Sequence, residues 1–448
     1  MQITIVGGGS YQWTPELLAD LLGTPSLHGA HIVLEDIDPA PLPRMEALAG
    51  RLNEALGARA TVSSTTEQRR ALEGADYVIV TISTGGFASM AVDLDVPERY
   101  GIRQSVGDTV GPGGITRALR NIPVLVGIAS DMEQVCPDAW LLNITNPMTV
   151  LTRAVTARTS IRTVGLCHEV GNWCLDLAIA LVKPAESVRP RVAGVNHFPV
   201  ITELDIDGQD GIGVLRQIVA DAGGPAALAP VAGRPEADPF TPLDFARRHV
   251  LSLTFLDRWG AVPAAGDRHL AEFLPSVLTE DSGWGADYGI ECTTIAERER
   301  HQAGYVADVE AWLDGSKDLQ TWQSGELPGP VIDALVTGTP LEAPVNIPNT
   351  GQCPDLPEGA VVESIGVVDA DGVRGRDRVV TPPPFAELLR RHVAVQELTV
   401  EAALTGDRVL AGAAYALDPL AGRGDLRRTD AMVGELMEHT GRWLPQFT

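Results

Sequence analysis

Lysine and paired cysteines are almost missing from this sequence. Its only lysines are Lys183 and Lys317, so the positive charge is nearly all arginine, and the formal net charge is −25. An excess of negative charge of this size argues against nucleic acid or an anionic membrane as a partner. The five cysteines are an odd number without a C-x-x-C pair. This pattern fits a reducing cytosol and argues against a disulfide framework.

Long apolar runs and a leader segment are lacking as well. No stretch approaches the roughly 20 consecutive apolar residues that span a bilayer. The N-terminus, MQITIVGGGS, has no basic segment and enters a strand at once, unlike a signal peptide. We therefore expect a soluble, cytoplasmic protein. Its 448 residues, 44% of them hydrophobic, can bury a large core divided between two or three domains.

The start of the chain has the order of a dinucleotide-binding unit. A short apolar strand at residues 2–6 leads into GGGSY and then into a helix at about residues 13–22. In this order, backbone N–H groups and the helix N-terminus can hold a pyrophosphate. The third glycine of the G-x-G-x-x-G motif is absent, with Gln12 in its place, so the motif alone is a weak signal.

The second strand strengthens this prediction. It covers residues 31–35 and ends in Asp36, a position from which a carboxylate accepts hydrogen bonds from the adenosine ribose and repels a 2′-phosphate. NAD is therefore predicted over NADP, and the alternative is a plain glycine turn beside a helix-capping acid. The predicted cofactor-binding residues are Gly7, Gly8, Gly9, Ser10, Tyr11, Asp36, Thr84 and Gly85.

Strands and helices keep alternating through the first half. Further strands are predicted at residues 75–81, 140–143 and 162–166, with a helix at about residues 39–56. This alternation predicts an α/β fold with a Rossmann-type, doubly wound sheet over residues 1–197.

A polar, glycine-rich stretch at residues 92–116 interrupts the alternation. It reads as a long loop, which in a compact domain usually has a function, and it contains Asp108. The helix that follows carries Arg117 and Arg120 near its start, where they could equally be surface charge.

Two short loops, GLCHEVGN and GVNH, carry the candidate metal ligands. Each follows a short apolar run, and Cys167 and His197 lie 30 residues apart. This spacing is too long for a zinc-finger knuckle but natural for the ends of neighbouring strands joined by a helix, where ligands gather in an α/β sheet. Cysteine with histidine alone favours zinc. A buried small cysteine and a strand-end histidine are the alternative.

The alternation weakens after residue 198. Residues 223–238 form an Ala/Pro/Gly-rich connection, and helices at about 243–259 and 294–314 flank the polar segment AGDRHLAE. From residue 385 the chain is strongly helical. We predict that residues 198–448 form a mixed, largely helical domain that closes over the strand ends, binds substrate and contributes to oligomerisation.

Several of these segments together resemble glycoside hydrolase family 4. They are VGGGSYQWTPEL, LEDID, GDTVGPGGITRALRNIP, NITNPMTVLT, VGLCHEVGN, GVNHF and VQELTVEAALTGDRVLAGAAYALDPL, in this order over nearly the whole chain. The nucleotide half is also similar to lactate and malate dehydrogenases. The resemblance implies an NAD- and Mn²⁺-dependent glycosidase that assembles as a homodimer or homotetramer.

The resemblance also implies a mechanism. NAD takes a hydride from C3 of the sugar, the resulting ketone acidifies the C2 proton, and a base removes it. The bond at C1 then breaks by elimination, water adds, and NADH reduces the ketone. This family is an exception to hydrolysis by two carboxylates. The metal, now expected to be Mn²⁺, polarises the C2 and C3 oxygens.

Residue roles follow from the matching motifs. Cys167 and His197 match the metal ligands, and Asn146 and Asn196 match sugar-contacting positions. His168 follows the cysteine where phosphosugar members carry Asp or Asn, and it is the candidate general acid or else a hydroxyl-binding histidine.

The base for the C2 proton is less defined. Phosphosugar members use a tyrosine, which AGDRHLAEFLP lacks, so Asp267 and His269 are the candidates. Asp108 and Arg268 are predicted substrate contacts, and a salt-bridged surface loop is the alternative for the AGDRHLAE segment.

The Cys-His pair in this family goes with unphosphorylated glycosides. With Glu169-Val170 behind it, the pair favours α-glucosides, then α-galactosides, and α-glucuronides or α-galacturonides are the alternative. Two other classes stay open. A 2-hydroxy-acid dehydrogenase would accumulate NADH without needing Cys167, and a non-catalytic NAD sensor could have lost the metal pair.

Overall fold

Six parallel strands form one half of the central sheet. In the computed structural model, which describes residues 1–228, 230, 240–321 and 324–447, their order is β3-β2-β1-β4-β5-β6. This order belongs to doubly wound dinucleotide-binding folds, and it confirms the predicted fold class. The strands are β1 Gln2–Val6, β2 His31–Glu35, β3 Thr61–Thr65, β4 Tyr77–Val80, β5 Trp140–Asn143 and β6 Arg162–Gly165.

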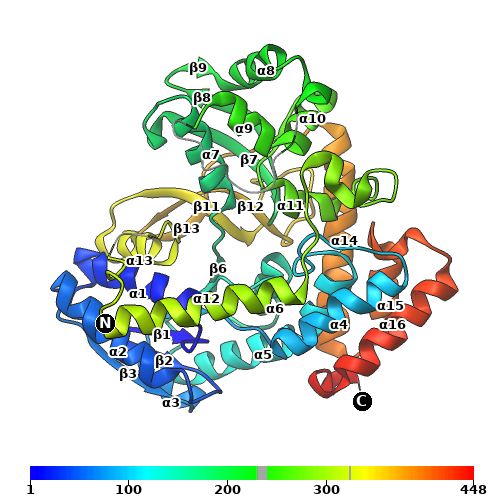
Figure 1. Cartoon of the computed structure of the whole chain (residues 1–448). Coiled ribbons are helices and arrows are strands. Elements are labelled where there is room, and N and C mark those ends of the chain that lie inside the picture. Colours follow the sequence, from blue (N-terminus) through cyan, green and yellow to red (C-terminus); the bar gives the residue numbers. More distant parts are fainter. Residues whose placement is uncertain (229, 231–239, 322–323, 448) are drawn as a thin grey trace.

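Helices cover both faces of these strands (Figure 1). Ile3 and Ile5 of β1 pack into the core that contains α1 (Trp13–Gly23) and α2 (Leu42–Leu56), whereas Val6 packs into the core that contains α5 (Gly111–Val135). Alternate residues of a strand point to opposite faces, so a strand with helices on both sides must be apolar throughout. The nearly unbroken apolar runs seen in the sequence follow from this arrangement. The remaining helices of this half are α3 Gln68–Leu72 and α6 Met148–Arg158.

The other half of the sheet is antiparallel and joins the first half at β6. The order continues as β11-β12-β7-β8-β10, with β13 on β12 and β9 on β8. Their bounds are β7 Val188–Val195, β8 Phe198–Ile206, β9 Gln209–Asp210, β10 Val262–Pro263, β11 Leu341–Pro348, β12 Val361–Asp369 and β13 Gly372–Gly375. The prediction that Cys167 and His197 follow neighbouring strands is therefore wrong. The hairpin β11–β12, from much later in the chain, lies between β6 and β7.

The stretch at residues 92–116 is also not one loop. Its first part belongs to α4 (Gly86–Arg99), and the loop covers only residues 100–110 before α5 begins. The buried face of α4 includes Asp93, which interrupts the apolar pattern that would have marked a helix. Asp93 is tolerated there because Arg120 of α5 pairs with it, and both side chains are fully buried.

The second half is rich in helices, as predicted. α7 (Glu169–Ala180), α8 (Gly211–Asp221), α9 (Pro242–Arg248) and α10 (Val250–Trp259) pack on β7 and β8 around a core of their own. The predicted helix at 243–259 is broken at His249 into α9 and α10. Residues 229 and 231–238 of the predicted connection at 223–238 lie outside the described residues.

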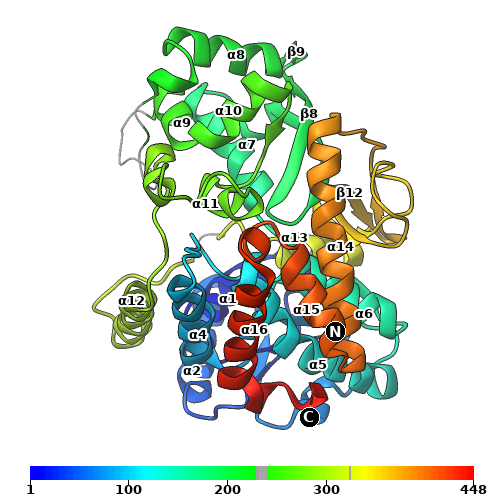
Figure 2. The ribbon, with the colours of Figure 1, turned by 90° about the vertical axis from the view of Figure 1, so that its right-hand side faces the viewer.

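The C-terminal helices return to the nucleotide half. α14 (Pro383–Thr405) packs against α5, α6 and α15 (Arg408–Leu417), and α16 (Leu426–Thr440) packs against α15 and α4 (Figure 2). The short α11 (Asp267–Leu270) precedes α12 (Ile295–Asp314), which lies against α2 and α4, and α13 (Pro328–Thr337) packs on α1.

The predicted domain boundary at residue 197 falls in the turn of the β7–β8 hairpin and stays a prediction. Among the described residues we find no helix with the length and apolarity of a membrane span.

Candidate active site

The glycine turn after β1 brings the second strand's acid to the predicted nucleotide site. The N–H groups of Gly7 and Gly8 donate to the Glu35 carbonyl oxygen at 2.9 and 2.7 Å, and the Gly9 N–H donates to Asp36 Oδ2 at 3.0 Å. Gly7 has φ 89, and a Cβ there would lie 2.0 Å from the Thr81 carbonyl oxygen, so this turn requires glycine. The predicted cradle and its acidic residue therefore lie side by side.

Exchange of Asp36 for asparagine tests this cradle. The amide oxygen of the new side chain would still accept the Gly9 N–H, but a neutral amide would not repel a 2′-phosphate. We expect the dissociation constant for NAD to rise about tenfold and that for NADP to fall, measured by titration calorimetry. Asp38→Asn, two residues further on and exposed, is the matched control. If Asp36→Asn binds NAD as tightly as the wild type does, and NADP as weakly, the assignment of Asp36 is wrong.

Helix α5 fixes the loops that follow β4 and β5. Asn121 Oδ1 accepts the Thr84 N–H at 3.0 Å, Arg120 Nε donates to the Thr84 carbonyl at 2.8 Å, and Arg117 Nε donates to the Asn146 carbonyl at 3.0 Å. The alternative that Arg120 is helix-surface charge is wrong, because its side chain is fully buried. Thr84 and Asn146 are thus held by one helix at adjacent strand ends.

Four residues in one row across the sheet connect the two metal-candidate loops. Gly165 of β6 pairs with Asn346, Asn346 with Glu363, and Glu363 with Gly194 of β7. Side chains paired across antiparallel strands share a face. Asn346 Nδ2 accordingly donates to Glu363 Oε2 at 3.2 Å, and Asn196 Nδ2 donates to the same oxygen at 2.9 Å. The hairpin that separates β6 from β7 therefore also links their ends.

His197 occupies a strained position in a tight turn. Val195 pairs with Phe198, so Asn196 and His197 alone form the turn between β7 and β8, and His197 has φ 65. A left-handed conformation of this kind costs a non-glycine residue on the order of 1–3 kcal/mol and is concentrated at functional sites. Histidine at position 197 therefore carries a conformational cost that glycine would not.

A hydrogen-bonded chain fixes the tautomer of His197. Burial would raise the pKa of Asp108, but the nearby His269, Arg117 and His197 lower it to about 2, so this carboxylate only accepts. Thr109 Oγ1 donates to Asp108 Oδ1 at 2.7 Å and lies 2.8 Å from His197 Nδ1, from which it must accept. The Nε2 lone pair of His197 is then available to a metal ion.

Asp108, His197 and His269 form a compact group. Each offers one ligand atom within 4.8 Å of the others, and the two imidazole rings lie 3.7 Å apart between centroids. Burial, followed by the nearby His269, lowers the pKa of His197 to about 3, so the His197 ring is uncharged at neutral pH. Cys167 lies outside this group, beside Asn196 and near Glu363, where burial raises the pKa of its thiol well above its ordinary value.

These side chains suit a metal ion and a polyhydroxylated ligand. The buried thiol of Cys167 would lose its proton only with a cation nearby, as happens when a thiolate binds a metal ion. Several buried polar atoms also have no hydrogen-bond partner among the described residues, which indicates groups that a ligand would satisfy. They are Asn146 Oδ1, Asn196 Oδ1, Asn346 Oδ1, Glu363 Oε1 and His269 Nδ1.

His168 is held between two carboxylates. Its Nδ1 lies 2.5 Å from Glu326 Oε1, and its Nε2 lies 3.8 Å from Glu169 Oε1. Burial would lower the pKa of His168, but the hydrogen bond and charge of Glu326 raise it to about 9. Glu169 Oε2 accepts the Gly266 N–H at 2.6 Å, and nearby histidines outweigh burial and lower its pKa to about 2.

Asp267 and Arg268 have other partners. Asp267 accepts the N–H groups of Leu251 and Ser252 at 2.7 and 3.0 Å, so its carboxylate binds the N-terminus of α10 rather than the group around His197. Arg268 Nε donates to the Ser105 carbonyl at 3.0 Å. His269 is the residue of this segment that the fold places beside His197.

Two residues of the predicted nucleotide site have structural contacts of their own. Ser10 Oγ accepts the Trp13 N–H at the start of α1, and Tyr11 packs against the core of α1 and α2.

Sequence reasoning missed Thr109, Glu326, Asn346 and Glu363. Asn346 and Glu363 gave a usable signal, because each is a polar residue inside an apolar strand, APVNIP and VVESIGVV. Thr109 adjoins Asp108 and could have been inferred as its partner. Glu326 gave none, since it precedes a helix in a polar segment 158 residues from His168.

Comparison with known proteins adds a family to this geometry. A model described as family 4 glycosyl hydrolase matches residues 2–181, and one for that family's C-terminal domain matches residues 192–421. The α-galacturonidase of Thermoanaerobacterium saccharolyticum is 34% identical over 99% of this chain and 96% of its own length. The α-galactosidase of Bacillus subtilis is 32% identical (100% and 99%), and the α-glucosidase of Erwinia rhapontici is 28% identical (99% and 98%).

Solved structures agree with the fold. The crystal structure of lplD from Bacillus subtilis has a TM-score of 0.87 with 30% identity, covering 97% of this chain and 99% of that one. The 6-phospho-β-glucosidase of Thermotoga maritima, solved with manganese, NAD⁺ and glucose-6-phosphate, has a TM-score of 0.80 with 21% identity, covering 99% of each chain. At this identity the second likeness speaks for the fold alone.

Proposed function

The chain belongs to glycosyl hydrolase family 4, whose two models together match most of its length, and from this we propose that it is an NAD- and Mn²⁺-dependent hydrolase of unphosphorylated α-glycosides. The observation that carries the proposal is the compact group of Asp108, His197 and His269 in a protein with a dinucleotide-binding sheet, with Cys167 hydrogen-bonded to Asn196 of the same turn as His197. Neither a 2-hydroxy-acid dehydrogenase nor a non-catalytic NAD sensor accounts for a family match over both halves.

The chain's own residues would divide the work between nucleotide, metal and sugar. Bound NAD and Mn²⁺ supply, in this family, reversible oxidation at C3 and polarisation of the neighbouring sugar oxygens. Gly7, Gly8, Gly9 and Asp36 hold the nucleotide, with Thr84 and Gly85 at the next strand end. Cys167 and His197 would hold the metal ion, and Asn146 and Asn196 would bind sugar hydroxyls with amide oxygens that have no partner among the described residues.

Two histidines would move protons. His168 donates to the leaving oxygen through Nε2, since Nδ1 is occupied by Glu326. His269 takes the C2 proton, because its Nδ1 has no partner among the described residues whereas both oxygens of Asp267 are engaged by α10. Asp108 and Arg268 line the site, the first through the Thr109–His197 chain and the second through the Ser105 loop.

The preferred sugar is proposed to be a neutral α-galactoside. The arginines of the site already face carboxylates, Arg117 that of Asp108 and Arg268 that of Glu297 at 3.8 Å, so their charge is partly balanced before a uronate binds. Relatives named for galacto-configured substrates are more similar than the one named α-glucosidase. The α-glucoside favoured by Glu169-Val170 is the second candidate, and α-galacturonides and α-glucuronides follow. A homodimer or homotetramer stays a prediction.

The assay uses p-nitrophenyl α-galactoside, α-glucoside, α-galacturonide and α-glucuronide, each with NAD, Mn²⁺ and a thiol reductant. We expect release of p-nitrophenol to be fastest from the galactoside and to stop when NAD is removed or Mn²⁺ is chelated, without net NADH. In deuterated water, the released sugar should carry deuterium at C2. The proposal fails if none of the four is cleaved, or if cleavage continues undiminished without both cofactors.

A further inference from the structure

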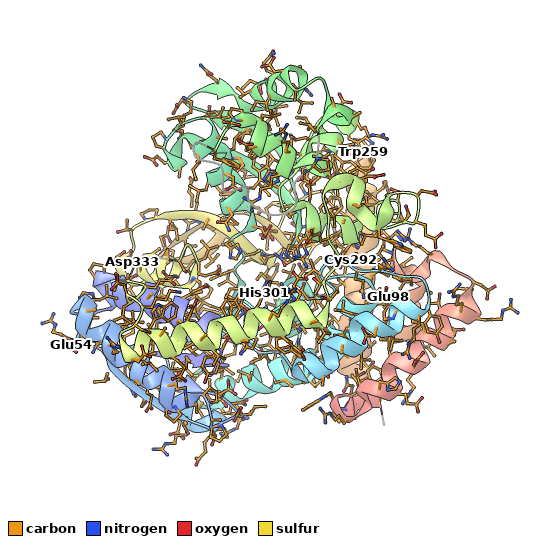
Figure 3. The ribbon with its side chains drawn as sticks, viewed as in Figure 1. Glu54, Glu98, Trp259, Cys292, His301 and Asp333 are labelled. Carbon is orange, nitrogen blue, oxygen red and sulfur yellow. The ribbon has the colours of Figure 1, made fainter. Side chains whose placement is uncertain are left out.

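Glu326 contacts the candidate general acid from a distant part of the chain. It lies two residues before α13, the helix that carries Asp333 in Figure 3, and its side chain is only 8% exposed. Its Oε1 lies 2.5 Å from Nδ1 of His168, which is 31% exposed. A carboxylate this buried requires a partner, and His168 is that partner.

The segment around Glu326 is fixed to the nucleotide-binding half. Ser324 donates through N–H and Oγ to the two oxygens of Asp20, at 2.7 and 2.5 Å, and its Oγ accepts the Glu326 N–H at 3.1 Å. Asp20 lies on the buried face of α1 and is 2% exposed. The helix that follows the glycine turn thereby sets the position of Glu326, and through it that of His168.

The hydrogen bond determines which nitrogen His168 presents. A carboxylate accepts the Nδ1–H, so the ring is held in one orientation with Nε2 on the side of Glu169, 3.8 Å away. Glu169 in turn is bound to the Gly266 N–H, next to the segment that carries His269. Nε2 therefore faces the side of the site where the proposed base lies.

We propose that Glu326 is a positioning residue that holds His168 with Nε2 toward the glycosidic oxygen of the substrate. The inference rests on the proposed function, because it assumes that His168 donates the proton to the leaving group. It assigns Glu326 a role in one step only, the cleavage of the C1–O bond. Nucleotide binding, metal binding and removal of the C2 proton do not need this hydrogen bond.

The test compares leaving groups. A p-nitrophenolate leaves with little help from an acid, whereas the methoxide of methyl α-galactoside needs protonation. For Glu326→Ala we expect kcat/KM to fall about 100-fold on the methyl glycoside and less than about fivefold on the p-nitrophenyl glycoside, mostly in kcat. Glu326→Gln, which keeps an oxygen acceptor for the Nδ1–H, should recover most of the loss. NAD affinity and Mn²⁺ affinity, measured by calorimetry, should stay unchanged in both variants.

A matched control and a second variant make the outcome decisive. Glu342 of β11 has a side chain that is 54% exposed and pairs with Arg376, and its exchange for alanine should affect neither substrate. If Glu326→Ala does not fold, Ser324→Ala loosens the same segment and should show the same substrate difference to a smaller degree. Equal losses on both glycosides, or no loss, would overturn the role of Glu326. Absence of any cleavage by the wild type would instead overturn the proposed function.

Discussion

Replacement of His197 by alanine is expected to lower kcat/KM by about 10³-fold and to weaken Mn²⁺ binding by a similar factor, since a lost ligand removes several kcal/mol of polarisation. The Asp108–Thr109–His197 chain keeps Nε2 free in the folded protein, so this histidine is prepared for a metal ion before one binds. Mn²⁺ affinity is measured by electron paramagnetic resonance, independently of turnover. Thr109→Val, which removes the acceptor of Nδ1–H, should cost about 10–100-fold in affinity.

The turn makes a second comparison possible at the same position. Because residue 197 has φ 65, glycine fits the backbone better than alanine does. We expect His197→Gly to unfold in urea with a free energy about 1 kcal/mol higher than His197→Ala, while both lose Mn²⁺ equally. His439→Ala, at a site that is 53% exposed, serves as control. Retention of wild-type Mn²⁺ affinity in both variants would show that the ligand lies elsewhere.

The nucleotide half could be predicted because its signals are local. The glycine turn, Asp36 at the end of a strand and the helices between strands are each recognised from residues that are neighbours in sequence. The errors came from distant contacts. The sequence predicts loop for residues 92–99 of α4, because Asp93 is tolerated inside only when it pairs with Arg120, 27 residues on. The β11–β12 hairpin enters between β6 and β7 by pairing that neither strand's own pattern reveals.

The candidate site shows the same division. Cys167, His197 and Asn196 could be selected because they stand directly after apolar strands. The hydrogen bonds that connect these loops could not be predicted, because they pass through Glu363. The Glu363 side chain binds Asn196 only because β12 lies beside β7. Buried acids of this kind have a common consequence: a carboxyl group removed from water resists ionisation, so it ties the stability of the site to pH.

Glu272 should show this dependence most strongly. It is fully buried, and its Oε1 accepts the N–H groups of Val106 and Gly107, both at 2.8 Å, just before Asp108. Its Oε2 has no partner among the described residues. Burial, with the nearby Asp108 charge, raises the pKa of Glu272 from 4.5 to about 8. The folded protein therefore keeps a proton here that the unfolded chain releases at much lower pH.

The sign of the effect follows from that difference in proton binding. Between the unfolded pKa of 4.5 and the folded pKa of about 8, the folded state binds more protons, so the free energy of unfolding falls as the pH rises. Above the folded pKa, the ionisation of Glu272 alone lowers the free energy of unfolding by on the order of 5 kcal/mol. Glutamine keeps the carbonyl acceptor for both N–H groups and cannot ionise. Glu272→Gln should therefore be more stable than the wild type near pH 9.

Urea unfolding of both proteins between about pH 4.5 and pH 9 measures this difference. The two curves should nearly coincide at the acid end and separate steadily as the pH rises. Other buried acids with a raised pKa, such as Glu363 and Glu35, are common to both proteins and cancel in the comparison. Glu387→Gln, at a side chain that is 74% exposed, should follow the wild type throughout. Parallel curves for Glu272→Gln and the wild type would mean that Glu272 is ionised in the folded protein, and that the loop before Asp108 is held by a charge.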